Sequence, residues 1–309
     1  MQSVGVVIPM YNRRDLICRC LDSVKAQTWR RLEVVVVDNN STDDSVAVVR
    51  DWCERHQVTA DTPDFRIKLL SESKPGAAAA RNKGLEAITS EHILFFDSDD
   101  EMLPDLVESA MREIGDRDVV CWDVEVVGLD GKVSHKPCRR GDVIRRQFFN
   151  AIFSTQRYMA RTDFIRCIGG WRDECMVWND FELGTRIALS GCRFTRLHRT
   201  LVRIYAQAES ITGTSFTRRA GEWEKTLAII EQTISTGDWK DRVKALRLLY
   251  YRRVILAAHY KREGSAELSR RLLTEALEGR HLSGIDRFWL RCLHAYTAGG
   301  GRAAYILWR

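Results

Sequence analysis

The sequence predicts an α/β fold, with a mostly parallel sheet flanked by helices and a C-terminal helical extension. Three observations support this prediction. Strand and helix signals alternate with short connections over the first hundred residues, which is typical of parallel strands joined by crossover helices. The predicted strands are apolar on both faces, as buried parallel strands are. From about Phe216 onward the pattern is helical and rich in lysine and arginine.

The first third of the chain contains four predicted strands, at residues 4–8, 33–37, 66–70 and 92–96. Apolar residues recur at helical spacing between residues 16 and 24, and Asn12 is the expected N-cap of that helix. A second helix follows residue 44, and an alanine-rich helix begins at Pro75-Gly76 and reaches Ile88. This order predicts a sheet with helices on both faces.

The rest of the chain is less regular. Residues 119–127 read as a strand that enters a hairpin at 128–131, and residues 180–189 read as a helix. In the basic extension an apolar stripe recurs at helical spacing, formed by Val243, Leu246, Tyr250, Val254 and Ala257. We expect this stripe to face protein, because it is narrow and interrupted by charge.

Composition and cysteine usage place the chain among soluble intracellular proteins. Its 309 residues are 45% hydrophobic and 29% charged, which excludes disordered, collagen-like and coiled-coil classes. No apolar run approaches the ~20 residues of a spanning helix. Pro9 and Asn12 interrupt the only early apolar run, so no signal peptide is expected. Nine cysteines without a CxxC pair indicate reduced thiols and a cytoplasmic location.

Charge divides the chain into two predicted domains, residues 1–214 and 215–309. The first has 30 Lys and Arg against 32 Asp and Glu, whereas the second has 18 against 10. The expected boundary between a nucleotide-binding half and an acceptor half of the first domain is near residue 105. A basic extension on a nearly neutral body suggests contact with an anionic surface, either membrane or nucleic acid.

The polar residues that directly follow strands are the candidates for chemistry, since ligands of open α/β sheets bind beyond the carboxyl ends of strands. Asp97, Asp99 and Asp100 follow the fourth strand. Three carboxylates in four residues repel one another unless a cation offsets them, and Mg²⁺ usually takes one or two carboxylates plus substrate phosphates. The alternative is an ordinary acidic helix start ahead of Pro104.

Two further segments have both a functional and a structural interpretation. Asp38 follows the second strand and could accept the imide N–H of a pyrimidine base, but the same segment could simply cap a helix. Arg81 lies in the alanine-rich helix and could reach a phosphate, or it could be a solvated side chain on a well-packed helix.

Taken together, the order and spacing of four segments closely resemble the family 2 glycosyltransferases, which have the GT-A fold. The segments are 6–12, 37–43, 81–85 and 96–100, which read VVIPMYN, VDNNSTD, RNKGL and FDSDD. A fifth block, with Gly169-Gly170-Trp171 and then residues 178–183 (WNDFEL), resembles the acceptor side of that family. The resemblance covers about residues 3–212 and leaves the basic extension outside.

The resemblance implies a role for individual residues. Tyr11 would pack on the nucleotide base, and Asp97-Ser98-Asp99 matches the DXD motif of the family. The implied nucleotide-sugar ligands are Pro9, Tyr11, Asn12, Asp38, Arg81, Asp97 and Ser98.

Metal binding and proton transfer are assigned in the same way. Asp99 would bind Mn²⁺ or Mg²⁺, with Asp97 beside the metal and the ribose. Asp180 matches the general base that deprotonates the acceptor hydroxyl, which suits a single displacement with inversion. A divalent ion would offset the charge gained by the diphosphate leaving group.

The chain departs from the family pattern at two positions. Asn179 stands where a glutamate often precedes the catalytic aspartate, which puts the usual acceptor contact in doubt. Gln207 falls about where the family tends to place a histidine, and a glutamine is a poor metal ligand. Arg203 is a candidate to compensate for that loss.

The sequence therefore predicts an inverting, metal-dependent hexosyltransferase that uses a nucleotide sugar, with UDP as the nucleotide by resemblance. Its acceptor would be a saccharide or a lipid-linked saccharide of bacterial surface glycan synthesis, met in the cytoplasm or at the inner face of the membrane. The alternatives are a nucleotidyltransferase and a catalytically impaired module that binds glycan or nucleic acid. Residues 9–12 lack the glycine-rich loop of the former, and intact Asp97, Asp99 and Asp180 argue against the latter. No nucleic acid is expected, because the aromatic residues of the extension fit a helical core equally well.

Overall fold

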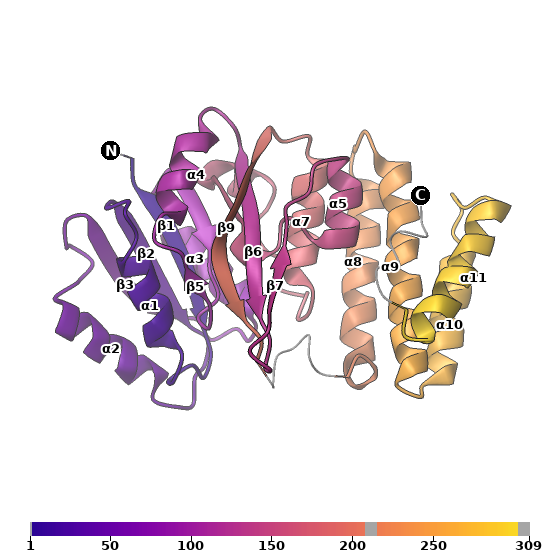
Figure 1. Cartoon of the computed structure of the whole chain (residues 1–309), viewed down its shortest axis with the longest axis horizontal. Coiled ribbons are helices and arrows are strands. Elements are labelled where there is room, and N and C mark those ends of the chain that lie inside the picture. Colours follow the sequence, from indigo (N-terminus) through magenta and orange to yellow (C-terminus); the bar gives the residue numbers. More distant parts are fainter. Residues whose placement is uncertain (1, 208–214, 302–309) are drawn as a thin grey trace. The chain divides into compact units, whose positions relative to one another are not determined.

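The computed structural model describes residues 2–207 and 215–301 and divides into two compact units (Figure 1). The first unit comprises residues 1–140 and 152–208, and the second comprises 141–151 and 209–309. The short segment 141–151 therefore belongs with the C-terminal helices, although the chain returns to the first unit after it. None of the described helices combines the length and the apolar character needed to cross a bilayer.

The first unit is built on one mixed sheet, ordered β3-β2-β1-β4-β8-β6-β9-β5, with β7 paired to β6. Strands β3, β2, β1 and β4 are parallel neighbours, whereas β8 is antiparallel to both β4 and β6. The strands are β1 Val4–Met10, β2 Leu32–Asp38, β3 Phe65–Ser71, β4 His92–Phe95, β5 Glu101–Met102, β6 Val119–Val127, β7 Val133–Lys136, β8 Tyr158–Arg161 and β9 Phe194–Tyr205.

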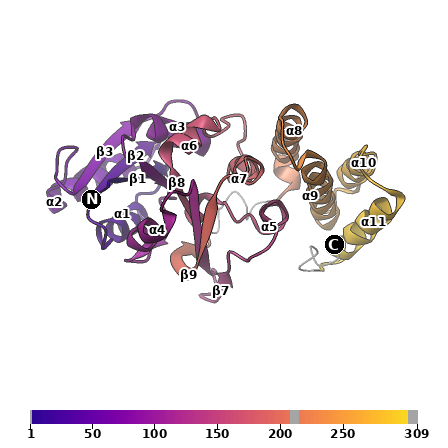
Figure 2. The ribbon, with the colours of Figure 1, turned by 90° about the horizontal axis from the view of Figure 1, so that it is seen from above.

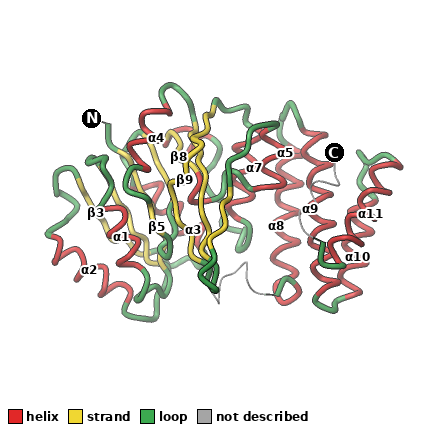
Figure 3. Tube along the Cα trace, in the orientation of Figure 1, coloured by secondary structure: helices red, strands yellow, loops and turns green. Residues whose placement is uncertain are grey.

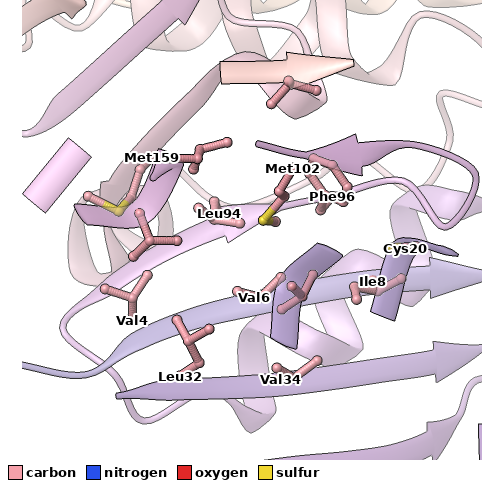
Figure 4. Close-up of a cluster of buried hydrophobic side chains, with 14 of the residues drawn as sticks. Val4, Val6, Ile8, Cys20, Leu32, Val34, Leu94, Phe96, Met102 and Met159 are labelled. Carbon is pink, nitrogen blue, oxygen red and sulfur yellow. The ribbon is translucent and has the colours of Figure 1, made fainter. Parts of the chain in front are cut away.

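Helices cover both faces of this sheet (Figure 2). Side chains of β1 alternate between the faces, so Val4, Val6 and Ile8 pack toward α1, α2 and α4. On the other face Val7 meets Gly84 of α3, and Gly5 meets Ile88, the residue after that helix. Figure 4 shows the first of these layers, where apolar side chains of neighbouring strands interdigitate. The helices of this unit are α1 Ile17–Lys25, α2 Ser45–His56, α3 Ala77–Ala87, α4 Leu106–Ile114, η1 Thr155–Arg157, α6 Thr162–Cys167 and α7 Asn179–Leu189.

Close contact between α3 and β1 fixes the height of that helix above the sheet. A Cβ atom on Gly84 would lie 2.3 Å from a methyl carbon of Val7, so only glycine lets the helix approach this closely. Because Arg81 is one turn earlier on α3, this contact also sets its position.

The second unit consists of helices in its described part (Figure 3). Of the predicted stripe on α9, four side chains are buried and only Val243 is exposed, so the stripe packs inside protein as expected. The helices are α5 Val143–Asn150, η2 Thr217–Arg219, α8 Ala220–Thr236, α9 Arg242–Arg262, α10 Ala266–Leu277 and α11 Gly284–Ala298.

The structure confirms the predicted α/β class with C-terminal helices and corrects one local detail. The first helix begins at Ile17, with Leu16 at its N-cap position, so the prediction that Asn12 caps it was wrong. Asn12 has a φ of 50° and turns the chain before the helix begins. Its side chain is used for a different contact, described below.

A buried carboxylate joins the sheet to the connection before β4. Glu33 on β2 is almost fully buried and accepts hydrogen bonds from the backbone N–H groups of Thr89 (2.9 Å) and Ser90 (3.0 Å) and from both hydroxyls. Burial alone raises the pKa of this carboxyl, but the hydrogen bonds from Ser90 and Thr89 outweigh burial, so the pKa is lowered.

We predict that Glu33→Gln lowers the free energy of unfolding by about 1–3 kcal/mol at neutral pH, because the charge-assisted hydrogen bonds are lost. A lowered folded-state pKa stabilises the protein above the unfolded-state pKa of about 4.3. The difference between wild type and variant should therefore shrink as the pH falls through the folded-state pKa. Urea denaturation over a pH series measures it, and a difference independent of pH would contradict this explanation.

Candidate active site

The predicted site residues that follow β1, β2 and β4 come together at one edge of the sheet. In the parallel register Met10 pairs with Asp38, and β4 lies on the other side of β1. The segments that follow β1, β2 and β4 therefore begin at neighbouring positions. Tyr11 is 54% exposed at this edge, which leaves its ring open to a ligand, whereas Pro9 is buried within β1.

Asn12 holds the loop that follows β2. The backbone N–H of Thr42 donates to Oδ1 of Asn12 (2.8 Å), and the N–H of Asn12 donates to Oγ of Ser41 (3.0 Å). This clamp fixes the loop after Asp38 to the turn that follows Tyr11. Oδ2 of Asp38 accepts a long hydrogen bond from Ser41 N–H (3.4 Å), while Oδ1 is buried and has no hydrogen-bond partner among the described residues. A buried acceptor without a partner is costly, so Asp38 is suited to accept a donor from a ligand.

The carboxylate of Asp97 is held on both oxygens. Arg81 donates to Oδ1 through Nη2 (2.7 Å), and Gln156 donates to Oδ2 through Nε2 (2.5 Å). Ser98, the next residue, is buried. Asp97 is therefore fixed in orientation by the protein itself, and its neighbour presents little surface to a ligand.

Asp99 has a different environment. One of its oxygens lies 3.5 Å from a guanidinium nitrogen of Arg13, and its backbone carbonyl accepts a hydrogen bond from Arg19. Arg19 in turn lies over the ring of Tyr205 at 3.8 Å. Burial and the negative charge of Asp97 raise the pKa of Asp99, which the two arginines only partly offset.

Gln156, which the sequence analysis did not single out, also bridges to the third carboxylate. Its Nε2 donates to Oδ2 of Asp100 (2.5 Å), whose other oxygen accepts from the backbone N–H of Tyr205 (2.9 Å). Burial and the charges of Asp97 and Asp99 raise the pKa of Asp100 well above its usual range. One amide group therefore holds two repelling carboxylates in place.

Arg81 connects this cluster to α7. Its Nη1 donates to Oδ1 of Asn179 (3.0 Å), and its guanidinium lies 4.4 Å from the ring of Trp171. Asn179 thus retains a defined contact at the position where the family pattern differs. Asp180 is the next residue, half-buried in the first turn of α7, and its Oδ1 accepts from the N–H of Phe181 (2.8 Å).

A buried ion pair fixes α7 to the loop that carries Trp171. Arg186 contacts both oxygens of Glu182, at 2.8 and 2.6 Å, and donates to the carbonyls of Ile168 and Gly170. Bidentate pairs of this kind define geometry as well as charge. The two glycines before Trp171 have positive φ angles, which lets the loop close on Arg186.

The carboxylates fit a divalent cation that is completed by substrate oxygens. Within residues 2–207 and 215–301, no three His, Cys, Asp or Glu side chains are arranged to hold a metal ion by themselves. Both oxygens of Asp97 are already hydrogen-bonded, which leaves Asp99 as the carboxylate with room for a metal. Burial and the charge of Asp97 raise the pKa of Asp99, and Mg²⁺ or Mn²⁺ shared with phosphate oxygens would offset that negative charge.

Arg203 was the candidate to compensate for the histidine that Gln207 replaces, but its side chain pairs elsewhere. Arg203 is paired with Glu125 (2.6 Å) and Glu101 (3.3 Å), and the side chain of Gln207 turns back to the carbonyl of Tyr205. Arg13 and Arg19 supply the positive charge beside Asp99 instead. Arg13 comes directly after the turn that ends β1, a position that could have marked it as a candidate.

Comparison with known proteins gives a family and a fold. The model of glycosyl transferase family 2 matches residues 5–171. The glycosyltransferase YibD of Escherichia coli is 34% identical over 108 residues, which are 35% of this chain and 29% of that protein. A GalNAc(5)-diNAcBac-PP-undecaprenol beta-1,3-glucosyltransferase of Campylobacter jejuni is 27% identical over half of each chain. The chain thus spans half or less of the length of these curated relatives.

Two solved structures share the fold over nearly the whole chain. Residues 1–349 of Staphylococcus aureus TarS, in complex with UDP-GlcNAc, superpose with a TM-score of 0.70 at 17% identity, covering 98% of this chain and 89% of that one. The mannosyltransferase PcManGT of Pyrobaculum calidifontis, with GDP-Man and Mn²⁺, gives 0.62 at 22% identity, covering 99% and 85%. These likenesses confirm the predicted GT-A fold.

We predict that Gln156→Met lowers the free energy of unfolding by about 1–3 kcal/mol, because the carboxylates of Asp97 and Asp100 both lose a hydrogen bond. Gln156→Glu should cost more, since it adds a buried negative charge to an acidic cluster. Chemical denaturation of the two variants tests this ranking. If the glutamate variant were as stable as wild type, the amide bridge would not hold the cluster.

Proposed function

The chain belongs to glycosyl transferase family 2, and from this premise we propose that it transfers a sugar from a nucleotide sugar to a hydroxyl group with inversion at the anomeric carbon. The proposed donor is a UDP-sugar. The proposed acceptor is a saccharide or lipid-linked saccharide in the synthesis of bacterial surface glycans. The relative from Campylobacter jejuni is named for such a polyprenyl-linked acceptor, which supports this choice.

The nucleotide would lie at the sheet edge where β1 and β2 end. Tyr11 offers an exposed ring on which the base could stack, and Asp38 offers an unpartnered oxygen that could accept the imide N–H of uracil. Pro9, Asn12 and Ser98 would act mainly by shaping the backbone, since the first and last are buried and Asn12 holds the loop. The complexes of TarS with UDP and UDP-GlcNAc support the choice of nucleotide.

Asp99 would hold Mn²⁺ or Mg²⁺ with Asp97 close by. Bound there, the cation would offset the negative charge that the diphosphate gains on leaving. Arg13 lies beside Asp99 and could contribute further positive charge toward the phosphates. The Mn²⁺ in the complex of PcManGT supports a divalent ion in this fold.

On the acceptor side, Asp180 would accept the proton of the attacking hydroxyl. Its carboxylate lies in the first turn of α7, next to Asn179, which Arg81 connects directly to Asp97. This chain of contacts from Asp97 through Arg81 to Asn179 is the observation on which the proposal depends. It holds the start of α7, which carries the proposed base, against the donor-side carboxylates, and a direct displacement needs such fixed positions of its reacting groups.

We place the catalytic residues in a domain of residues 1–214 and assign 215–309 to a basic helical extension that contacts the anionic inner face of the membrane. The balance of eight positive charges in the extension supports this contact.

We predict that the wild-type protein turns over at least one nucleotide sugar in the presence of Mn²⁺ or Mg²⁺, as measured by release of nucleoside diphosphate from a panel of UDP-, GDP- and dTDP-sugars. Asp180→Asn should lower turnover by ~10²–10⁴-fold, because the general base is lost. Donor binding in calorimetry should stay nearly unchanged, since the residue acts on the acceptor.

The matched control is Asp163→Asn, which changes an exposed aspartate of the neighbouring helix α6 in the same way. This variant should keep wild-type turnover and donor binding. Loss of donor binding in Asp180→Asn would move the residue to the donor side and refute its assignment as the base. Absence of turnover with every donor in the wild type would refute the proposed function.

A further inference from the structure

Two buried cysteine side chains lie in contact in the first unit, outside the candidate active site. Cys121 lies in β6 and Cys138 lies two residues after β7, and both are free thiols that are fully buried. Their sulfur atoms are 2.9 Å apart, a hydrogen-bond distance for two thiols. A disulfide needs about 2.0 Å between its sulfurs. A small movement of either side chain would therefore bring the two sulfurs to bonding distance.

The sheet holds both cysteines in these positions. Strand β7 pairs with β6 in an antiparallel ladder, which brings the segment after β7 back along β6. The backbone N–H of Cys138 donates to Oδ1 of Asp123 (2.5 Å), and the sulfur of Cys121 lies 3.5 Å from the carbonyl oxygen of Thr195 on β9. The contact between the thiols is thus set by the fold of the first unit.

Two guanidinium groups lie beside the thiols. Arg196 pairs with Cys121 in the parallel register of β6 and β9, so the two side chains are on the same face of the sheet. Arg157 is buried and donates through Nη2 to the carbonyl of Lys136 (2.9 Å), two residues before Cys138. Nε and Nη2 of Arg196 are buried and find no hydrogen-bond partner among the described residues. A negative charge on a neighbouring sulfur would stabilise this cation.

These surroundings make Cys138 the more acidic of the two thiols. The hydrogen bond from Cys121, together with the positive charges of Arg157 and Arg196, lowers the pKa of Cys138 against the opposing effects of burial and of Asp123. The same hydrogen bond and burial raise the pKa of Cys121 well above its usual range. Because the thiolate is the nucleophilic form of cysteine, Cys138 is the attacking sulfur and Cys121 keeps its proton.

We propose that Cys121 and Cys138 form a site at which hydrogen peroxide oxidises the protein reversibly to an intramolecular disulfide. The site is separate from the proposed sugar transfer and does not depend on it. An acidic thiol next to a second, resolving thiol is typical of cysteines that react with peroxide. Burial of both sulfurs favours an oxidant as small as hydrogen peroxide over a bulky disulfide. Residues 133–137 and 139–140 are exposed, so a local opening of this segment admits the oxidant.

The reaction takes place in two steps. The thiolate of Cys138 attacks one oxygen of hydrogen peroxide, so a sulfur–oxygen bond forms, the oxygen–oxygen bond breaks and hydroxide leaves. The thiol of Cys121 then attacks the sulfenic acid on Cys138. The sulfur–sulfur bond forms, the sulfur–oxygen bond breaks, and the proton of Cys121 leaves with the oxygen as water. The two sulfurs give up two electrons in total, which reduce the peroxide, and a dithiol reductant returns them.

Mass spectrometry of the full-length protein tests this proposal without any substitution. The reduced protein, treated with an equivalent of hydrogen peroxide, should lose the mass of two hydrogen atoms. A proteolytic digest without reductant should then contain a peptide pair joined between Cys121 and Cys138. Treatment with dithiothreitol should restore the original mass. The variant Cys121→Ser should accumulate sulfenic acid on Cys138, which dimedone labels, because the resolving thiol is missing.

The role of the guanidinium groups is tested by the rate of oxidation. Arg196→Gln should slow disulfide formation about tenfold, because a smaller fraction of Cys138 is thiolate when the neighbouring positive charge is lost. The matched control is Arg199→Gln, which removes an exposed arginine from the same strand, where it pairs with Asp105. This control should react at the wild-type rate. Circular dichroism checks that both variants are folded.

A further control separates this pair from the other cysteines. Cys167 is exposed, so Cys167→Ser removes an accessible thiol and should leave the cross-link and its rate unchanged. The proposal is overturned if peroxide leaves Cys121 and Cys138 reduced in the wild type, or joins either of them to a different cysteine. Equal rates for the wild type and folded Arg196→Gln would contradict activation of Cys138 by that guanidinium.

Discussion

The buried guanidinium of Arg81 is the contact on which the arrangement of the candidate active site depends. A buried positive charge is stable only when paired, and Arg81 pairs with Asp97, donates to Asn179 and stacks on Trp171. These three partners come from the loop after β4, the start of α7 and the loop before it. The close contact of Gly84 with Val7 fixes the helix that carries Arg81. One side chain therefore determines how parts of the chain distant in sequence meet at the sheet edge.

The same contacts explain the distribution of roles among three neighbouring carboxylates. Asp97 and Asp100 have both oxygens hydrogen-bonded within the protein, and Gln156 contributes to each. Asp99 is held less completely, and burial with the charge of Asp97 raises its pKa. A cation shared with a diphosphate would resolve this imbalance, which is why the proposed metal is assigned to Asp99. Internal hydrogen bonds orient the carboxylates of Asp97 and Asp100 on either side of Asp99 in the sequence.

The sequence predicted the parts of the fold that follow from local pattern. Strands β1 to β4 and β6 and helix α3 were recognised within about two residues, because apolar runs and glycine or proline boundaries define them. The short strands β5 and β8 were not anticipated, since they exist only through pairing with β9, β4 and β6. Asn12 was misread as a helix cap because its real contact, with Thr42, spans thirty residues. For the same reason Gln156 and Arg19 were missed, as neither lies in a segment with a recognisable motif.

In the proposed mechanism, Asp99 shares a divalent cation with the diphosphate of the donor. Calorimetry of UDP and GDP binding, with and without Mn²⁺, measures this coupling directly in the wild type and in Asp99→Asn. Mn²⁺ alone should bind weakly, since no three metal-ligating side chains converge within the described part of the chain. It should strengthen binding of the nucleoside diphosphate in the wild type, and Asp99→Asn should abolish that effect. If Mn²⁺ left the affinity for both nucleotides unchanged, or if Asp99→Asn kept the full effect, the assignment of the metal to Asp99 would be contradicted.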